Sequence, residues 1–258
     1  MKLFISMSLI FVVIVSAQAD NRYFMEQISL REGLSQTSVE SVLRDATGLV
    51  WIGTRDGLNR YDGNEMNTYF HEPDDTTSLQ DNHIYFVMED ENQDVWVGTS
   101  GGLALYKPSI EGFERINPFN TDTMPIYGHY YVRDQSLVFG SSDHLAIYDL
   151  KKRSFRILPF RGEIQALPFP FKMVPWEGAK VVIASRWQGL FICDVNTAEL
   201  RRASFCDEKD IMDAHLDIHD KLWVSVPTKG VMRFNKEGDL LAHFSEQNSG
   251  LSNNNVLE

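Results

Sequence analysis

Positive charge is scarce in this sequence. The chain has 24 Lys and Arg residues against 36 Asp and Glu, which gives a formal net charge of −12 at pH 7. An acidic surface repels the phosphate backbone of DNA and RNA. We therefore expect no nucleic-acid partner.

Cysteine is also scarce, with Cys193 and Cys206 as the two examples. Both fall in one predicted hairpin whose turn lies near Asn196. Cys193 is expected to face a residue near Arg201, which leaves Cys206 several positions further along the strand. Because each strand residue adds more than about 3 Å, that separation exceeds the reach of a disulfide. We favour two free thiols over a bridge, although an oxidising compartment would permit one.

Long apolar runs are missing except at the N-terminus. Lys2 precedes an apolar run over residues 3–15, and the Ser-Ala-Gln-Ala of residues 16–19 offers an Ala-x-Ala cleavage site. The run is short for the ~20 residues that span a bilayer. We therefore predict a cleaved signal peptide over residues 1–19 rather than an uncleaved anchor, and an exported, soluble domain over residues 20–258.

Motifs of known catalytic centres are scarce in the chain. It lacks a phosphate-binding glycine loop, a His-Glu-x-x-His motif and a Cys-x-x-Cys pair, and the Gly-x-Ser-x-Gly spacing of residues 98–102 lies between two predicted strands rather than before a helix. We predict no catalytic residue and no cofactor in this segment.

Asp213, His215, Asp217 and His219 alternate along the chain. On one continuous strand they would share a face, and histidine with carboxylate suits zinc. Aligning Trp223 with the first repeat, however, places Asp217 in a turn. Only Asp213 and His215 remain weak metal candidates, and we favour a polar strand lining a channel, with no metal.

The sequence is organised around a repeated unit. Residues 45–62 read DATGLVWIGTRDGLNRYD, a turn, an apolar strand, a second turn and a second strand; residues 90–106 repeat this order. Three fainter copies follow. The five anchors are Trp51, Trp96, Val138, Val182 and Trp223, spaced by 45, 42, 44 and 41 residues. A period of roughly 43 residues is typical of propeller blades.

Each unit is predicted to supply four short strands. In the first unit these are residues 39–44, 49–53, 58–61 and 66–70; in the second, 84–89 is the first strand and 113–116 the last. The third and fourth units have drifted, and their innermost strands are expected at 127–131 and 167–171. A further strand is expected at 23–28, and the fifth unit begins at Ile211.

These units predict an all-β fold, a β-propeller of about five four-stranded blades. Residues 33–39 recur as residues 250–256, 217 residues later, so a sixth repeat has just begun where the sequence ends. A single blade cannot bury both of its faces without a neighbour. We therefore expect either a closed five-bladed ring or, as we favour, part of a larger, seven-bladed propeller.

The repeated aromatic and glycine positions are interpreted as structural. We expect each indole to fill the space between blades and to donate to a backbone carbonyl. Glycine permits close approach of blades, and Thr54 and Thr99 can bond locally to turns. The structural positions are Trp51, Gly53, Gly57, Trp96, Gly98, Gly102, Gly189, Trp223 and Gly230.

Loops at one face of the propeller are the predicted ligand surface. Arg55 and Arg186 hold corresponding positions in their repeats, beside Asp56 and Trp187. An arginine pair could grip carboxylate or sulfate groups, while Trp187 could stack on a sugar ring. The alternative is ordinary solvated loop charge. The candidates are Arg55, Asp56, His83, Tyr127, Arg186 and Trp187, with Asn82, Ser100 and Lys229 on the same face.

The first repeat resembles the two-component regulator propeller repeat of periplasmic sensor regions. The residues that carry the resemblance are Gly33-Leu34-Ser35, Val39, Asp45, Gly48, Trp51-Ile52-Gly53-Thr54, Asp56-Gly57-Leu58 and Tyr61-Asp62-Gly63. The second repeat departs from the pattern at Gln93 and Lys107, and the later repeats lose several glycines and tryptophans.

This resemblance implies a sensor input region in a two-component system, periplasmic and carried by a parent protein anchored in the inner membrane. The partners would be a small-molecule or oligosaccharide ligand and downstream signalling modules of the same chain. Those modules would be a histidine kinase of a phosphorelay or a diguanylate cyclase, and a homodimer is conceivable. Two alternatives stay open: a propeller enzyme acting on polysaccharide, and a free-standing periplasmic interaction protein.

Overall fold

The computed structural model describes residues 27–118, 126, 128–132, 136–167 and 171–256. The signal peptide expected over residues 1–19 and most of the strand expected at 23–28 lie outside them. Strands dominate the described residues, whose helical segments are two 3-10 turns, η1 (Leu30–Glu32) and η2 (Pro108–Ile110). No helix in the described ranges has the length and apolar character needed to cross a bilayer.

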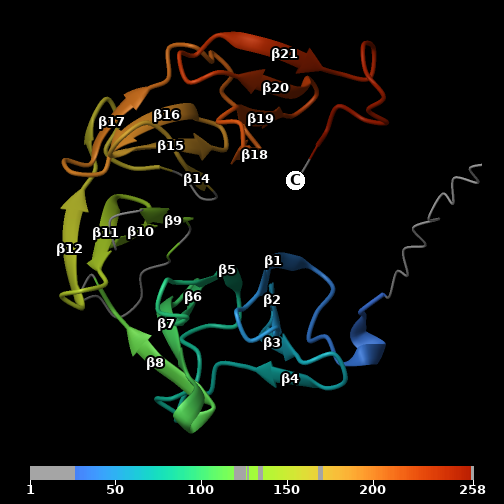
Figure 1. Ribbon diagram of the computed structural model, residues 1–258, viewed down its shortest axis with the longest axis vertical. Helices are drawn as coiled ribbons and strands as arrows, with labels where there is room; N and C mark the ends of the chain where they lie inside the picture. Colours follow the sequence, from blue (N-terminus) through green and yellow to red (C-terminus); the bar gives the residue numbers. More distant parts are fainter. Residues whose placement is uncertain (1–26, 119–125, 127, 133–135, 168–170, 257–258) are drawn as a thin grey trace, which may run out of the picture.

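Five sheets are arranged radially, with their first strands towards a shared centre (Figure 1). Sheet one contains β1 (Val39–Arg44), β2 (Val50–Thr54), β3 (Leu58–Tyr61) and β4 (Met66–Tyr69). Sheet two contains β5 (Ile84–Glu89), β6 (Val95–Thr99), β7 (Gly102–Lys107) and β8 (Gly112–Ile116). Sheet three contains β9 (Gly128–Val132), β10 (Ser136–Gly140), β11 (His144–Asp149) and β12 (Ser154–Pro159).

Sheet four contains β14 (Phe171–Pro175), β15 (Lys180–Ser185), β16 (Gly189–Asp194) and β17 (Glu199–Arg202), with the short β13 (Arg161–Gly162) added in parallel beside β17. Sheet five contains β18 (Asp213–Leu216), β19 (Leu222–Val226), β20 (Gly230–Phe234) and β21 (Leu240–Phe244). Within each sheet the four main strands pair antiparallel in chain order. The predicted all-β propeller is confirmed, with each of the five anchor residues on the second strand of a sheet.

Two sequence-based predictions about sheet four are wrong. The innermost strand was expected at 167–171, but β14 begins at Phe171 and the backbone of Leu167 instead donates to Ser142 O at 2.7 Å. Residues 168–170 lie outside the described residues, and β14 extends beyond the expected strand to Pro175. Cys206 was expected on a strand, but β17 ends at Arg202.

Both cysteines are buried free thiols. Cys193 pairs across the hairpin with Leu200, one residue from the expected partner. Its side chain lies in the core between sheets three and four, whereas Cys206 lies in the core between sheets four and five. The fourth sheet therefore separates the two sulfur atoms.

A hydrogen-bonded turn leads into the tryptophan strand of sheet one. Asp45 Oδ1 accepts from the backbone N–H groups of Thr47 and Leu49, each at 3.0 Å. Asp45 Oδ2 accepts from Trp51 Nε1 at 2.8 Å. The indole was expected to donate to a backbone carbonyl, and this prediction is wrong because a carboxylate is the acceptor. A charged acceptor gives the stronger bond in a buried site.

The same arrangement recurs in sheets two and five. Trp96 Nε1 donates to Asp90 Oδ2 at 2.9 Å, and Trp223 Nε1 donates to Asp217 Oδ2 at 2.8 Å. In the threonine turns, Thr54 Oγ1 donates to Gly57 O at 2.9 Å, as expected for a local bond. Sheets one and two are thus fixed at both ends of their second strand by side-chain bonds to turns.

Aromatic side chains join neighbouring sheets. The ring of Tyr106, from sheet two, meets Trp51 of sheet one edge-on at 4.8 Å between centroids. Tyr148 of sheet three meets Trp96 in the same way at 5.0 Å. Glycine allows this close packing, because a Cβ on Gly53 would lie 2.7 Å from Ile84 Cγ2 and one on Gly98 would overlap the Phe86 ring.

The five sheets form an arc that is open between sheets five and one (Figure 1). On the open side of sheet one, Val42 is 64% exposed. On the open side of sheet five, Trp223 stacks on Phe244 at 5.5 Å and is only partly buried, whereas Trp51 and Trp96 are covered by the next sheet. The backbone of Asn255 and Val256 returns to this face, where Val256 O accepts from Ser225 Oγ.

Candidate functional site

The predicted ligand surface is the end of each sheet at which the second strand turns into the third; we call it the rim. Its described turns are residues 55–57, 100–101, 141–143, 186–188 and 227–229. Loops at this position project from a rigid scaffold of strands, and their side chains are available for binding.

One group of predicted residues meets where sheets one and two adjoin. Arg55 Nε donates to Glu40 Oε1 at 2.6 Å, which is also an ion pair. Asp56 Oδ1 accepts from Asn82 Nδ2 at 3.0 Å, so the link between the sheets is bonded to the rim turn. Burial lowers the pKa of His83, whose charge also interacts with Glu40 and Arg55. Arg55, Asp56 and His83 are therefore neighbours at the rim.

A second group lies where sheets four and five adjoin. Trp187 is 59% exposed, and the guanidinium carbon of Arg186 lies 5.2 Å from the centre of its ring. Arg186 Nε is 4.0 Å from Asp210 Oδ1, and neither atom has a hydrogen-bond partner among the described residues although both are buried. Lys229 Nζ pairs with Glu208 Oε1 at 2.6 Å.

The structure does not assemble the expected arginine pair. Arg55 belongs to sheet one and Arg186 to sheet four, and the two sheets are not neighbours (Figure 1). Each arginine instead interacts with its own carboxylate. Tyr127 lies outside the described residues. The rim therefore offers two separate groups, of which only the second presents an exposed aromatic ring.

The weak metal candidates do not form a cluster. Asp213 and His215 lie on β18, and Lys172 Nζ is 3.5 Å from Asp213 Oδ1. Asp217 follows the strand and accepts from the backbone N–H groups of its turn, at 2.8 Å for His219. Within the described part of the chain, no three His, Cys, Asp or Glu side chains gather closely enough to hold a metal ion.

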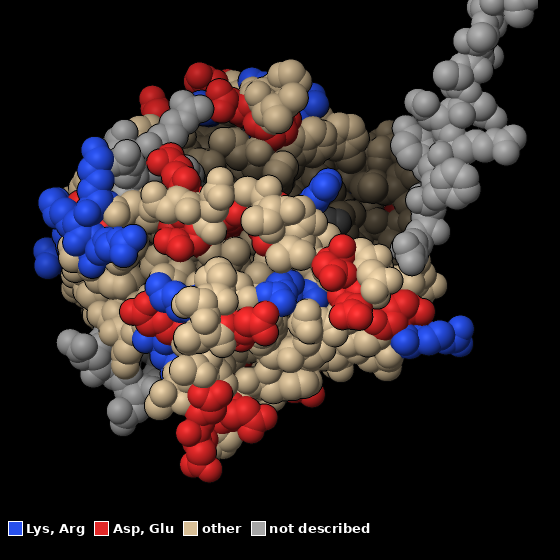
Figure 2. All heavy atoms as spheres, turned by 60° about the horizontal axis from the view of Figure 1, so that its bottom comes forward, with Lys and Arg blue, Asp and Glu red and all other residues tan. Residues whose placement is uncertain are grey.

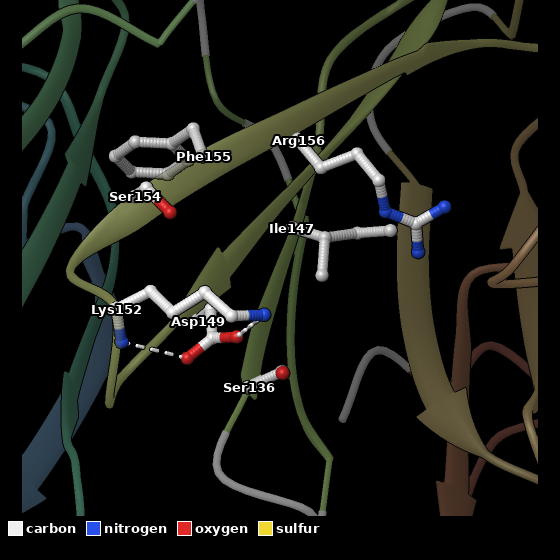
Figure 3. Close-up of a pocket in the computed structure, with 7 residues that line it drawn as sticks. All are labelled: Ser136, Ile147, Asp149, Lys152, Ser154, Phe155 and Arg156. Carbon is white, nitrogen blue, oxygen red and sulfur yellow. Dashed lines mark hydrogen bonds and ion pairs between the residues drawn. The ribbon is translucent and has the colours of Figure 1, made fainter.

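A cavity that the sequence did not predict lies at the opposite end of sheet three from the rim (Figure 3). It measures about 220 Å³ and is lined by Ser136, Ile147, Asp149, Lys152, Ser154, Phe155 and Arg156. The signal in the sequence was the basic run Lys151-Lys152-Arg153 before β12, which is unusual in so acidic a chain. Figure 2 shows basic side chains gathered at the side where β11 and β12 lie in Figure 1, while acidic groups are scattered over the rest of that face.

Comparison with known proteins supports the sequence resemblance. The family profile described as "Two component regulator propeller" matches residues 78–101. A stretch of 66 residues is 41% identical to Histidine kinase P4 of Formosa agariphila and covers 25% of this chain. That stretch is 5% of the relative's own length.

Two solved structures have a similar fold. The extracellular domain assigned to the hybrid two-component system BT3049 of B. thetaiotaomicron matches 83% of this chain with a TM-score of 0.69 and 19% identity. Virginiamycin B lyase of Staphylococcus aureus matches 81% with a TM-score of 0.61 and 10% identity.

The chain covers 31% of the first structure and 70% of the second. At these identities the likeness shows the fold alone, and that fold occurs both in a domain of a two-component system and in a lyase. The profile match adds that the chain carries the two-component regulator propeller repeat at residues 78–101, as its resemblance to that family predicted.

Proposed function

We propose that this chain is the extracytoplasmic input region of a two-component-type signalling protein and that it senses a ligand at the rim. The observation that carries the proposal is the two-component regulator propeller repeat at residues 78–101, in a chain that shares a 41% identical stretch with a histidine kinase. The segment has no catalytic role; the parent protein's histidine kinase or diguanylate cyclase module supplies the output.

The group at sheets four and five is the favoured ligand contact. The exposed ring of Trp187 offers a flat apolar surface, and such surfaces stack on sugar rings. Arg186 lies beside it and has a buried Nε without a hydrogen-bond partner among the described residues. A guanidinium in this position suits a carboxylate or sulfate group. The ligand class is therefore a small molecule or oligosaccharide that carries an acidic group.

Signal transmission would follow from differential binding. A ligand shifts an equilibrium between two arrangements only by the difference between its affinities for them. A ligand held between the turn of sheet four and the link to sheet five would favour one relative position of these sheets. That position would be passed to the modules that follow in the parent protein.

Binding to a panel of neutral and acidic oligosaccharides tests the proposal. We expect an acidic member to bind, and Trp187→Ala to weaken its affinity about tenfold or more, because a buried aromatic contact contributes more than about 1 kcal/mol. Arg201→Ala is a matched control, since Arg201 is an exposed arginine of sheet four that pairs with Glu199 away from the rim. Depolymerisation of a panel member would instead establish a propeller enzyme, and a panel without any binding would contradict the proposed ligand class.

A further inference from the structure

We propose that the cavity of sheet three is a second binding site, for a small organic anion. It lies at the opposite end of the sheets from the rim, so it is independent of the ligand contact at Trp187.

Five of the lining residues, all but Lys152 and Phe155, share one face of the sheet. Ser136, Asp149 and Ser154 are paired side by side across β10, β11 and β12. Ile147 and Arg156 form the next such row on the same face, because side chains two residues apart point the same way. Ile147 belongs to the core shared with sheet four, so this face is turned towards the neighbouring sheet.

The side chains beside the cavity are smaller than those at the corresponding positions of sheet one. The register of sheet one places Trp51 beside Arg60, and the guanidinium lies 5.8 Å from the indole centre. In sheet three the corresponding residues are Val138 and Ile147. These aliphatic side chains fill less of the space between sheets than an indole covered by a guanidinium. The recess lies beside this row, with Ile147 in its lining.

The arginine of the cavity is not neutralised. Arg156 Nη1 donates to Asn196 O of sheet four at 2.9 Å, and no described acidic residue pairs with it. At the corresponding position of sheet four, Arg201 Nη2 pairs with Glu199 at 2.8 Å. Lys152 Nζ lies 3.0 Å from Asp149 Oδ2, so this pair is balanced and Arg156 leaves the lining with one positive charge.

The turn above the cavity adds further positive charge. Asp149 Oδ1 accepts from the backbone N–H groups of Lys151 and Lys152, at 3.0 and 2.8 Å. Arg153 is held in the left-handed region at φ 51°, which is uncommon for a residue with a side chain. The turn thus carries three consecutive basic residues in a chain of net charge −12, which concentrates anions locally.

These features define the ligand. The fork of Arg156 suits a phosphate, sulfate or carboxylate, and the hydroxyls of Ser136 and Ser154 can donate to the remaining oxygens. Ile147 offers apolar contact to the body of the molecule, whereas the Phe155 ring packs in the core on the other face of the sheet (Figure 3). Drug-sized ligands occupy about 300–1,000 Å³, so a recess of about 220 Å³ suits a smaller molecule rather than a polymer or a membrane surface.

Isothermal titration calorimetry with phenyl phosphate and with inorganic phosphate, at constant ionic strength, tests the site. We expect the intact chain to bind phenyl phosphate and Arg156→Gln to weaken binding about tenfold or more, as for the loss of one charged hydrogen bond. Ser154→Trp should abolish binding without changing the charge, because the indole would fill the recess. Lys236→Gln should leave it unchanged, since Lys236 Nζ and Asp220 form an equivalent 3.0 Å pair on sheet five.

Circular dichroism and thermal melting of each variant establish that it is folded. Equal affinity of Arg156→Gln and the parent chain, or undiminished binding by Ser154→Trp, would overturn the assignment. Binding to vesicles of anionic phospholipid without binding of either soluble probe would also overturn it, in favour of a membrane contact. Because no rim residue is changed, this result is independent of the oligosaccharide experiment.

Discussion

An aspartate six residues before each repeat tryptophan has two roles at the residue scale. Its Oδ1 closes the turn between the first and second strands, and its Oδ2 binds the indole N–H. Burial raises the pKa of Asp45, but bonds from Thr47, Trp51 and Leu49 outweigh it and leave this pKa below its usual range. The carboxylate form is therefore part of the folded structure.

Asp45→Ala should destabilise the chain by about 1–3 kcal/mol, because the buried Trp51 N–H and the turn lose their acceptor. Urea unfolding monitored by circular dichroism measures this change. Asp62→Ala is the matched control, since Asp62 closes an exposed turn through Asn64 and Glu65 and binds no indole. Equal costs for the two variants would show that the indole bond contributes nothing.

Acid should unfold the chain partly through Asp45 and Asp217. The indole bond of Trp223, followed by the backbone bond of Lys221, lowers the pKa of Asp217 to about 2. The unfolded value is about 3.9, so between these values the unfolded chain binds more protons and acid favours unfolding. The stabilisation is complete above about pH 4 and is lost as the pH falls towards 2.

Replacing the carboxyl by an amide removes this titration. Asp217→Asn should therefore show a shallower loss of stability between pH 4 and 2 than the parent chain, in urea titrations at a series of pH values. The matched comparison is with Lys236→Gln, which leaves the turn aspartate in place. If the free energy of unfolding of Asp217→Asn fell as steeply between pH 4 and 2 as that of the parent chain, ionisation of Asp217 would not contribute to acid unfolding.

At the scale of the element, two glycines allow close packing within and between sheets. Gly98 faces the Phe86 ring within its own sheet, and Gly53 faces Ile84 of the next sheet. Both positions follow the tryptophan by two residues, so the indole and the bare backbone occur side by side on β2 and on β6. A side chain at either glycine would displace the strand it faces.

Gly98→Ala should cost about 1–3 kcal/mol in the free energy of unfolding, the usual range for overpacking a core. Phe86 is itself buried and cannot move away cheaply. Gly250→Ala is the control, because nothing lies within 4 Å of an added Cβ there. Similar melting curves for the two variants would contradict the packing argument.

Strands of the first two sheets were predicted within about one residue of their bounds, because hydrophobic alternation and turn residues coincide there. Sheet four was harder, since two prolines obscure the strand pattern in the sequence at 167–171, and β14 begins only at Phe171. The acceptor of the indole was missed because aspartate is also an ordinary turn residue, and its second oxygen is not visible in the pattern. The cavity was missed because it depends on side chains brought together by register, Ile147 with Arg156.

The open arc dominates the behaviour of the whole molecule. Trp223 and Phe244 face outwards on sheet five, and Val42 faces outwards on sheet one. Corresponding positions elsewhere are covered by a neighbouring sheet. We interpret these two faces as the surfaces that further repeats of a larger propeller would cover, and exposed apolar faces otherwise promote association.

The chain by itself should therefore self-associate, with a sedimentation coefficient that rises with concentration. Val42→Lys and Trp223→Lys should each reduce this rise, because a charge on the face opposes burial. Ile110→Lys is the control, since Ile110 is similarly exposed but lies on η2, away from both open faces. A monomer at all concentrations would contradict the role assigned to these faces.

The separation of Cys193 and Cys206 by sheet four has a practical consequence. Burial raises the pKa of Cys193 to about 12, and burial also raises that of Cys206, so neither thiol should react until its surroundings open. Modification of Cys193 would report parting of sheets three and four, and modification of Cys206 would report parting of sheets four and five. One preparation of the chain thus carries a thiol on each side of sheet four. Comparing the modification rates of the two thiols would show which of the two interfaces between sheets opens more readily when ligand binds.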